Sequence, residues 1–178
     1  MIEIGFHTDA FNSSYWNFEQ CLQWAQKNDV HWIECGMIDG VSWIHGLGYQ
    51  PHVAMWEDPM MWREKIAKYG VRFSQIDAAF PLSLPEGATL GVEYALRTIR
   101  WAYIVGCDHI DTTDDRFAPK GLTDAVALDM MKRAYAQIRS HIVSRRSQSI
   151  HHVKSLTFVR ELVEDANQRM AQKEMSVT

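Results

Sequence analysis

Short apolar segments alternate along the chain with longer segments in which apolar residues recur every three or four positions. The short segments are typical of β-strands and the longer ones of amphipathic helices. The short segments predict strands at residues 2–6, 30–35, 71–77 and 107–112. After each predicted strand comes a helical stripe, and the stripes are Phe18, Cys21, Leu22 and Ala25; Trp62, Ile66 and Tyr69; Val92, Leu96, Ile99 and Tyr103; and Leu128, Met131, Tyr135 and Ile138.

Capping and turn residues mark several of the predicted helix ends. Asp58 followed by Pro59 is a typical helix start, with the aspartate as N-cap and the proline in the first turn. Gly70 and Gly106 follow the second and third stripes, and glycine is common just after the end of a helix. Thr123 can cap the fourth helix. These signals support the helices that the apolar stripes predict.

The predicted elements follow the order β-α-β-α-β-α-β-α, and no clear hairpin signal lies between them. This alternation predicts a parallel sheet with helices packed on it. A complete (β/α)₈ barrel takes roughly 250 residues, whereas this chain has 178. We therefore predict an α/β fold, an incomplete TIM-type (β/α) barrel of about four βα units with a C-terminal helical tail.

Residues 141–178 differ in composition from the rest of the chain. They contain no glycine or proline, and their Lys and Arg residues outnumber their Asp and Glu residues. An amphipathic helix is predicted there by an apolar stripe, which consists of Leu156, Val159, Val163, Ala166 and Met170. The chain is thus expected to divide into a half barrel over residues 1–140 and a basic, helical or partly disordered tail over residues 141–178.

The overall composition narrows the classes of function. Hydrophobic residues make up 47% of the chain and charged residues 22%, as is usual for a folded domain. No apolar run approaches the roughly 20 residues of a membrane span, so no membrane association is expected. The net charge of −4 makes nucleic acid an unlikely partner. Three cysteines are too few for a disulfide framework, which favours a cytoplasmic location.

Four segments of the body resemble the N-terminal half of a known protein family. They are IEIGFHTDAF, HWIECGMIDGVSWIHGLGYQPH, GVRFSQIDAAFPLS and GCDHIDTTDD. The family is the sugar phosphate isomerase/epimerase group with the xylose isomerase-like TIM barrel, and the resemblance covers residues 1–140. It implies a xylose isomerase-like half barrel that catalyses metal-assisted proton transfer next to a carbonyl of a sugar or polyol.

The same resemblance implies a divalent metal cofactor, which would be Mn, Mg, Co or Zn. In the family the ligands are typically two Glu, one Asp and one His, and they come mainly from strands five to eight of the barrel. The chain has no matching strands after residue 140. Its metal ligands are therefore unknown from the sequence, and its catalysis is expected to be impaired by truncation.

Polar residues stand at the carboxyl ends of the four predicted strands, where (β/α) barrels place their active sites. They are His7, Glu34, Asp77 and Asp111. Carboxylates and imidazoles at such positions can move protons or bind sugar hydroxyls. We predict Glu34 and Asp77 as catalytic residues, and His7 and Asp111 as substrate-binding residues. The competing interpretation is that each one caps a helix, bonds a loop amide or pairs with a nearby Arg or Lys.

The predicted loop at residues 36–56 combines glycines with aromatic and histidine side chains, among them Trp43, His45 and His52. Aromatic rings stack on sugars and histidines can hold hydroxyls or phosphate, so we predict a lid with Trp43 and His45 as substrate-binding residues. An alternative of equal weight is a loop that folds its own aromatic side chains into a small core. The acidic run at residues 111–115 offers oxygen ligands for Mg²⁺ or Mn²⁺, although such runs are usually only solvated.

Taken together, these features predict a sugar phosphate isomerase/epimerase-like protein whose partner is a small sugar or sugar phosphate. The alternative is a non-catalytic half barrel that self-associates, as a homodimer through open sheet edges or the tail helix, or that is the product of a broken gene. A third interpretation, an abasic-site nuclease, is weaker because the acidic body offers no surface for tracking phosphates.

Overall fold

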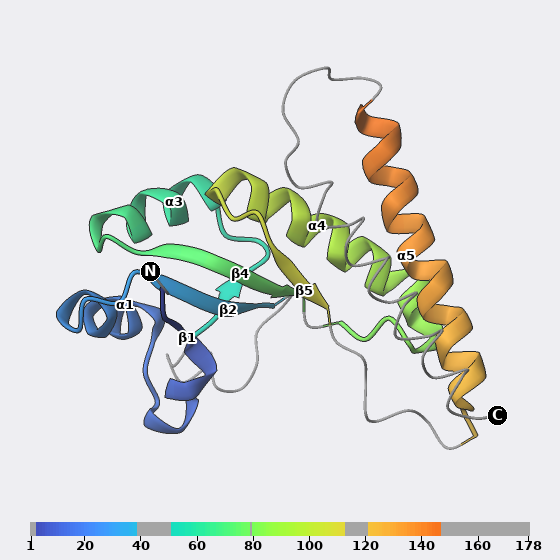
Figure 1. Cartoon of the computed structure of the whole chain (residues 1–178), viewed down its shortest axis with the longest axis horizontal. Coiled ribbons are helices and arrows are strands. Elements are labelled where there is room, and N and C mark those ends of the chain that lie inside the picture. The colour runs from blue at the N-terminus through green and yellow to red at the C-terminus, as the bar shows by residue number, and fades with distance from the viewer. Residues whose placement is uncertain (1–2, 39–50, 79, 113–120, 147–178) are drawn as a thin grey trace.

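The computed structural model describes residues 3–38, 51–78, 80–112 and 121–146, and its centre is a parallel β-sheet (Figure 1). Four strands lie side by side in the order β1, β2, β4, β5, and all neighbours in this order are parallel. A further short strand, β3, pairs with the end of β2. The strand bounds are β1 Gly5–His7, β2 Trp32–Ile38, β3 Val53–Ala54, β4 Arg72–Ala78 and β5 Ile110–Thr112.

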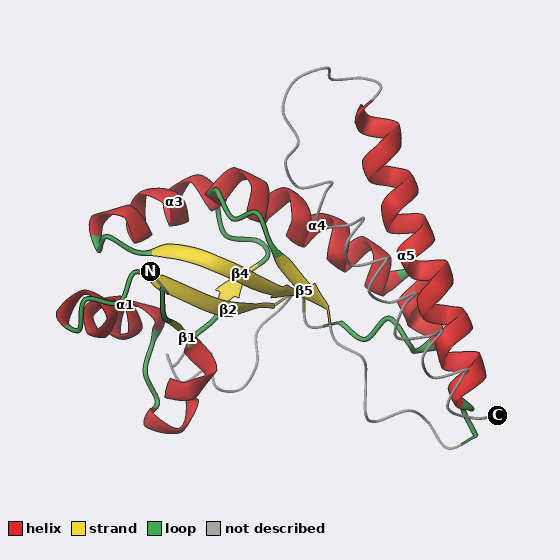
Figure 2. Cartoon of the chain, viewed as in Figure 1, coloured by secondary structure: helices red, strands yellow, loops and turns green. Residues whose placement is uncertain are grey.

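Described helices connect β1 to β2, β3 to β4 and β4 to β5, as is usual for parallel strands. The described helices are the 3₁₀ helix η1 at Thr8–Ser14, α1 at Phe18–Lys27, α3 at Pro59–Lys68, the 3₁₀ helix η2 at Pro85–Ala88, α4 at Leu90–Val105 and α5 at Asp124–Arg146. Figure 2 shows α3 and α4 lying along one side of the sheet, with α5 beside α4. None of the helices in the described ranges is both long and apolar enough to cross a membrane.

The main hydrophobic core lies between one face of the sheet and helices α1, α3 and α4. Alternate residues of β2, namely Ile33, Cys35 and Met37, are fully buried there. Leu22 of α1 and Trp101 of α4 belong to the same cluster. Because side chains alternate across a strand, the residues between these buried positions must lie on the other face of the sheet.

A second hydrophobic cluster joins α4 to α5. Leu96 of α4 packs there with Ala134 and Ile138 of α5, and all three side chains are buried. The hydroxyls of Thr112 and Tyr135 are 2.6 Å apart, which links the end of β5 to the same helix. The fourth predicted helix is thus an integral part of the described body.

Helix ends in the described body are capped, and the signals predicted at Asp58 and Gly106 are confirmed. Asn17 caps α1 with a capping box, in which its side chain accepts a hydrogen bond from the Gln20 amide. Asp58 caps α3, with Pro59 as the first helical residue. Gly106 follows α4 with a φ of 89°, a left-handed conformation that glycine adopts without steric cost.

The strand boundaries differ from the prediction, since the strands predicted at 2–6, 30–35 and 71–77 are Gly5–His7, Trp32–Ile38 and Arg72–Ala78 in the structure. The fourth predicted strand begins at Ile110 instead of residue 107, because the amide of Cys107 donates to the Ala102 carbonyl at 2.8 Å and so closes the end of α4. The strand β3 was not predicted, since a two-residue strand leaves no pattern of its own in the sequence. The alternating α/β order with a parallel sheet is confirmed, and it is compatible with part of a (β/α) barrel.

Helix α5 continues through the predicted boundary at residue 140 and ends at Arg146. Residues 141–146 therefore extend the last helix of the body. The predicted tail helix at residues 156–170 lies outside the described residues.

Candidate functional site

The face of the sheet opposite the main core carries the polar residues of the strand ends. In the register of the sheet, His7 pairs with Glu34, and Asp77 pairs with both Gly36 and Asp111. Register partners project to the same face, as do residues two apart along a strand. His7, Glu34, Asp77 and Asp111 therefore share one face near the carboxyl ends of the parallel strands. The sequence predicts their position at the strand ends but not the shared face.

An irregularity in β4 is responsible for the orientation of Asp77. Phe73 pairs with Ile33, but the next pair along the strands is Gln75 with Glu34, so Ser74 is an extra residue in β4. Strict alternation from the buried Phe73 would have put Asp77 on the core face. The bulge reverses the alternation, which buries Ile76 in the core and places Asp77 with the polar side chains.

Asp77 is the carboxylate with the most perturbed environment in this group. Its Oδ1 atom is buried and has no hydrogen-bond partner among the described residues. Burial and the neighbouring charges of Asp111, Asp9 and Glu34 raise the pKa of Asp77 to about 6, while His7 acts in the opposite direction. A carboxyl group with a pKa near neutrality can both accept and return a proton under physiological conditions.

His7 is held in a defined orientation by the residue two positions later. The backbone N–H of Asp9 donates to His7 Nδ1 at 3.0 Å. Because Nδ1 accepts this bond, the neutral ring carries its proton on Nε2, which is then a hydrogen-bond donor. The carboxylate Oδ2 of Asp9 lies 3.7 Å from the same Nδ1. We interpret that approach as proximity, since one nitrogen cannot accept from the amide and donate to the carboxylate together.

The carboxylate of Asp9 also contacts a histidine from a distant part of the chain. Its Oδ1 lies 3.2 Å from Nε2 of His52, whose side chain is 17% exposed. The His52 ring lies over Gly36, because a Cβ atom on Gly36 would be 3.2 Å from His52 Nδ1. Asp9 and His52 thus join His7 and Asp77 at the carboxyl ends of the strands.

The other two predicted carboxylates have ordinary hydrogen-bond partners. Glu34 Oε1 accepts from Gln75 Nε2 at 2.8 Å. Asp111 is exposed, and its Oδ1 accepts from the Thr112 amide at 2.8 Å. The bond of Asp111 to a neighbouring amide is the kind of contact that the competing interpretation expects for such a residue.

Three residues of this group were missed as site residues in the sequence, namely Asp9, His52 and Gln75. The spacing His7-x-Asp9 was an available signal, because a short-range His–Asp pair after a strand often orients the imidazole. His52 was visible only as one of several polar residues in the predicted lid. The predicted lid residues Trp43 and His45 lie outside the described residues.

No three His, Cys, Asp or Glu side chains within the described ranges are arranged as ligands for a metal ion. That finding concerns the described residues alone and does not test the divalent metal that the family resemblance implies. Asp114 and Asp115 of the acidic run lie outside those ranges. The metal cofactor stays a prediction from resemblance.

The three cysteines offer no reactive thiol. Cys21, Cys35 and Cys107 are all buried and free. Burial raises the pKa of Cys21 to about 12 and that of Cys107 to about 11, and it raises the pKa of Cys35 as well. Such thiols stay protonated at neutral pH, so they are poor nucleophiles.

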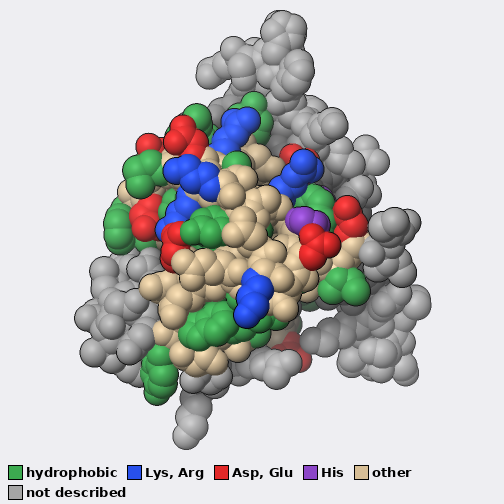
Figure 3. Space-filling model, turned by 90° about the vertical axis from the view of Figure 1, so that its left-hand side faces the viewer, with side chains coloured by type: hydrophobic (Ala, Val, Ile, Leu, Met, Phe, Trp, Pro, Cys, Tyr) green, Lys and Arg blue, Asp and Glu red, His purple; other side chains and the backbone are tan. Residues whose placement is uncertain are grey.

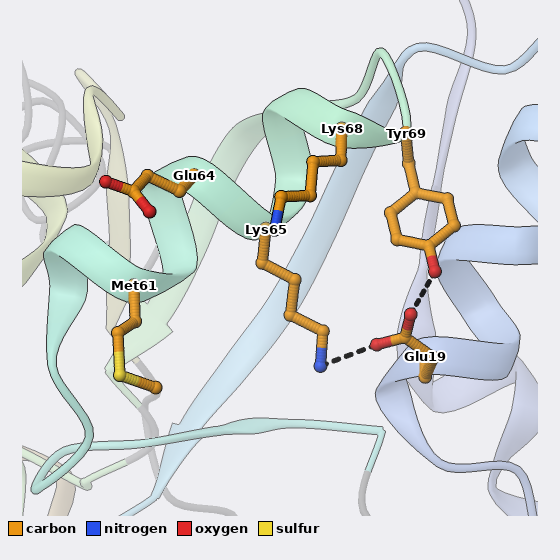
Figure 4. Close-up of a pocket in the computed structure, with 6 residues that line it drawn as sticks. All are labelled: Glu19, Met61, Glu64, Lys65, Lys68 and Tyr69. Carbon is orange, nitrogen blue, oxygen red and sulfur yellow. Dashed lines mark hydrogen bonds and ion pairs between the residues drawn. The ribbon is translucent and has the colours of Figure 1, made fainter.

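A surface depression of about 400 Å³ lies elsewhere, between α1 and α3 (Figure 4). Two of its charged groups are paired with each other, since Lys65 Nζ is 2.7 Å from Glu19, and the Tyr69 hydroxyl donates to the same carboxylate. These two hydrogen bonds lower the pKa of Glu19. The side of the molecule on which α1 lies shows acidic and basic side chains intermixed (Figure 3). Neither feature indicates a ligand.

Comparison with models of known protein families finds no match to this chain, and no curated protein matches it either. The functional argument therefore depends on the geometry of the strand ends and on the resemblance of the four sequence segments.

Proposed function

We propose that this protein binds a small sugar or sugar phosphate at the carboxyl ends of its parallel strands and transfers a proton next to the carbonyl. The reaction class would be isomerisation or epimerisation, which both begin with removal of a proton from the carbon beside a carbonyl group. The resemblance of residues 1–140 to the sugar phosphate isomerase/epimerase group supports the same class.

The observation that carries this proposal is the environment of Asp77. Its partly buried carboxylate has an Oδ1 atom with no hydrogen-bond partner in the described residues, and its pKa is raised to about 6. A general base near neutral pH needs a carboxylate of this kind, because a strongly hydrogen-bonded carboxylate is a weaker proton acceptor. Asp77 is therefore our candidate for the group that removes the proton.

The neighbouring side chains supply complementary roles. His7 presents Nε2–H as a donor, which can hold the carbonyl oxygen of the substrate as negative charge develops on it. The oxygens of Glu34 and Asp111 can accept bonds from sugar hydroxyls, and Gln75 orients Glu34. The catalytic role that the sequence predicts for Glu34 stays a prediction. The divalent metal implied by the resemblance stays part of this proposal.

Solvent exchange provides a direct test. The protein is incubated in D₂O with a panel of three- to six-carbon aldoses and ketoses, free and phosphorylated, with Mg²⁺ and separately with a chelator. Proton NMR then follows the signal of the hydrogen beside the carbonyl. We expect that signal to disappear with at least one compound, and we expect Asp77→Asn to slow the exchange by about 100-fold or more.

The exposed Asp108 serves as the matched control, since Asp108→Asn makes the same chemical change near the start of β5. Its exchange rate should equal that of the unmodified protein. Absence of exchange with every compound, in a sample that unfolds cooperatively, would contradict the proposed function.

A second candidate is self-association as a half barrel. Within the described sheet, β1 and β5 each have a neighbouring strand on one side only, and such edges can pair with another chain. Sedimentation velocity over a range of protein concentrations tests this interpretation. A dimer that persists on dilution is the expected result, whereas a monomer at all concentrations would rule it out.

A further inference from the structure

We propose that His52, oriented by Asp9, is the proton donor that completes the transfer begun by Asp77, and that the two groups face each other across Gly36. This inference rests on the proposed function, because it assigns the second proton-transfer group of the same site.

The register of the sheet places these residues in one row. Val53 pairs with Met37, so His52 stands beside Gly36. On its other edge β2 pairs with β4, where Gly36 is the partner of Asp77. Since a strand has only two edges, β3 must lie on the edge of β2 opposite β4. His52 and Asp77 therefore flank Gly36 from opposite sides.

Gly36 is the reason that the His52 ring fits at this position. An added Cβ atom would lie 3.2 Å from Nδ1 of His52, which is closer than nearly all contacts of real Cβ atoms, and 3.6 Å from Cε1, which is an ordinary contact distance. The missing side chain thus leaves room for the imidazole between the two strands. It also keeps any third side chain from separating His52 and Asp77 in this row.

Asp9 fixes which nitrogen of His52 takes part in proton transfer. Nε2 of His52 lies 3.2 Å from Oδ1 of Asp9 and can donate its proton there. Nδ1 is the nitrogen on the Gly36 side of the ring. The carboxylate also stabilises the imidazole in its positively charged form, as in other His–Asp pairs. Asp9 is therefore a positioning residue.

The charged groups around this row come from every strand of the site. His7 lies at the end of β1 and Asp9 follows it in η1, while Glu34 belongs to β2 and Asp77 to β4, with Asp111 in β5. The four carboxylates favour a positively charged histidine among them. This arrangement suits an imidazolium that donates a proton.

The proton balance of the step is as follows. Asp77 takes the proton from the carbon beside the carbonyl, and the electrons of the broken C–H bond form an enolate. His52 gives its Nδ1 proton to the opposite face of the same carbon of the enolate, which forms a new C–H bond and completes an epimerisation. Asp77 is then protonated and His52 neutral, and both return to their starting states by exchange with water.

The test separates the two proton transfers. His52→Gln should retain at least half of the deuterium exchange at the substrate carbon, because Asp77 still removes and returns the proton, but product formation should fall by about 100-fold. Asp77→Asn should lose both deuterium exchange and product formation. The matched control is His31→Gln, because His31 forms a similar pair with Asp29 at 3.2 Å before the start of β2, and this variant should retain both rates.

A spectroscopic measurement tests the role of Asp9 without relying on turnover. Long-range ¹H–¹⁵N correlation of the histidines should show that neutral His52 carries its proton on Nε2, and Asp9→Asn should change that tautomer population. In the same variant product formation should fall about tenfold or more, with the alkaline limb of its pH profile at lower pH.

Each negative result has a defined meaning. Product formation at the normal rate by His52→Gln, with exchange intact, would overturn this inference and leave the proposed function standing. A protonated Nδ1 in neutral His52 would also overturn it. Absence of exchange by the unmodified protein would overturn the proposed function and this inference together.

Discussion

Asp77 differs from the neighbouring carboxylates in the way its oxygen atoms are partnered. Glu34 accepts a hydrogen bond from Gln75, and Asp111 accepts one from the Thr112 amide. The buried Oδ1 of Asp77 accepts none from the described residues. In the sequence these three residues are equivalent acidic positions at strand ends. The structure distinguishes them, because hydrogen bonding and burial depend on neighbours that are distant along the chain.

The raised pKa of Asp77 predicts a stability effect with a definite sign. Its pKa is about 6 in the folded protein and 3.8 in a model compound, so the folded state binds this proton more tightly than the unfolded state does. Ionisation of Asp77 therefore destabilises the fold as the pH rises from about 4 to about 6, and the penalty persists above that range. Asp77→Asn should raise the free energy of unfolding by about 1 to 2 kcal/mol near pH 8, a value reduced for the partial exposure of the group.

Urea unfolding of Asp77→Asn and of the unmodified protein at several pH values measures this effect. The difference between the two should shrink as the pH falls and vanish near pH 4. Asp108→Asn again controls for the substitution itself. A difference that stays constant from about pH 4 to pH 8 would show that it does not come from ionisation of Asp77.

At the scale of elements, helix boundaries are encoded more locally than strand boundaries. Asp58 caps α3 through its own side chain, which accepts from the Met60 amide at 2.9 Å. The capping contact involves residues only two positions apart, so the sequence reveals it. The bulge at Ser74 depends instead on the pairing of β2 with β4. No local pattern around Ser74 could have revealed that the side chain of Asp77 points to the polar face.

The capping box of α1 predicts a measurable contribution to stability. Asn17 Oδ1 accepts from the Gln20 amide, and the Asn17 amide donates to Gln20 Oε1, both at 2.9 Å. Asn17→Ala removes the cap and should lower the free energy of unfolding by about 1 kcal/mol. The control is Gln26→Ala, an exposed position late in the same helix, which should change stability by less than about 0.5 kcal/mol. Equal effects of the two substitutions in urea unfolding would contradict the assigned role of the cap.

At the scale of the whole molecule, the structure joins two hydrophobic clusters into one body. The main cluster connects the sheet with α1, α3 and α4, and the second connects α4 with α5. Helix α4 contributes to both clusters, so unfolding of α5 should also destabilise the packing of the sheet. This arrangement predicts a single cooperative unfolding transition for the described body.

Ile138→Ala tests that cooperativity. Ile138 is 3% exposed and packs in the α4–α5 cluster, so truncation should cost about 2 to 4 kcal/mol by creating a cavity. All seven tryptophans lie at or before Trp101, so their fluorescence reports on the body without α5, whereas far-UV circular dichroism reports on all helices. The unfolding transitions seen by the two signals should shift by the same amount. The control Gln137→Ala, at an exposed neighbouring position, should shift neither transition. A separate early transition seen only by circular dichroism would mean that α5 unfolds independently.

The sequence by itself determined the order of the four main strands and of the helices that follow them, the parallel sheet and the positions of polar residues at the strand ends. These features follow from hydrophobic periodicity and from capping residues, which act over a few positions. The sequence also singled out His7, Glu34, Asp77 and Asp111, because parallel strands bring their carboxyl ends to one edge of a sheet.

Only the tertiary structure decided which residues lie close enough together to form a site. It brought His52 to Asp9 and placed its ring over Gly36 by means of a two-residue strand, β3. It also turned Asp77 to the polar face through the bulge in β4. Both outcomes depend on the pairing of segments far apart in the chain, and that pairing is set by packing of the whole sheet instead of by any local pattern.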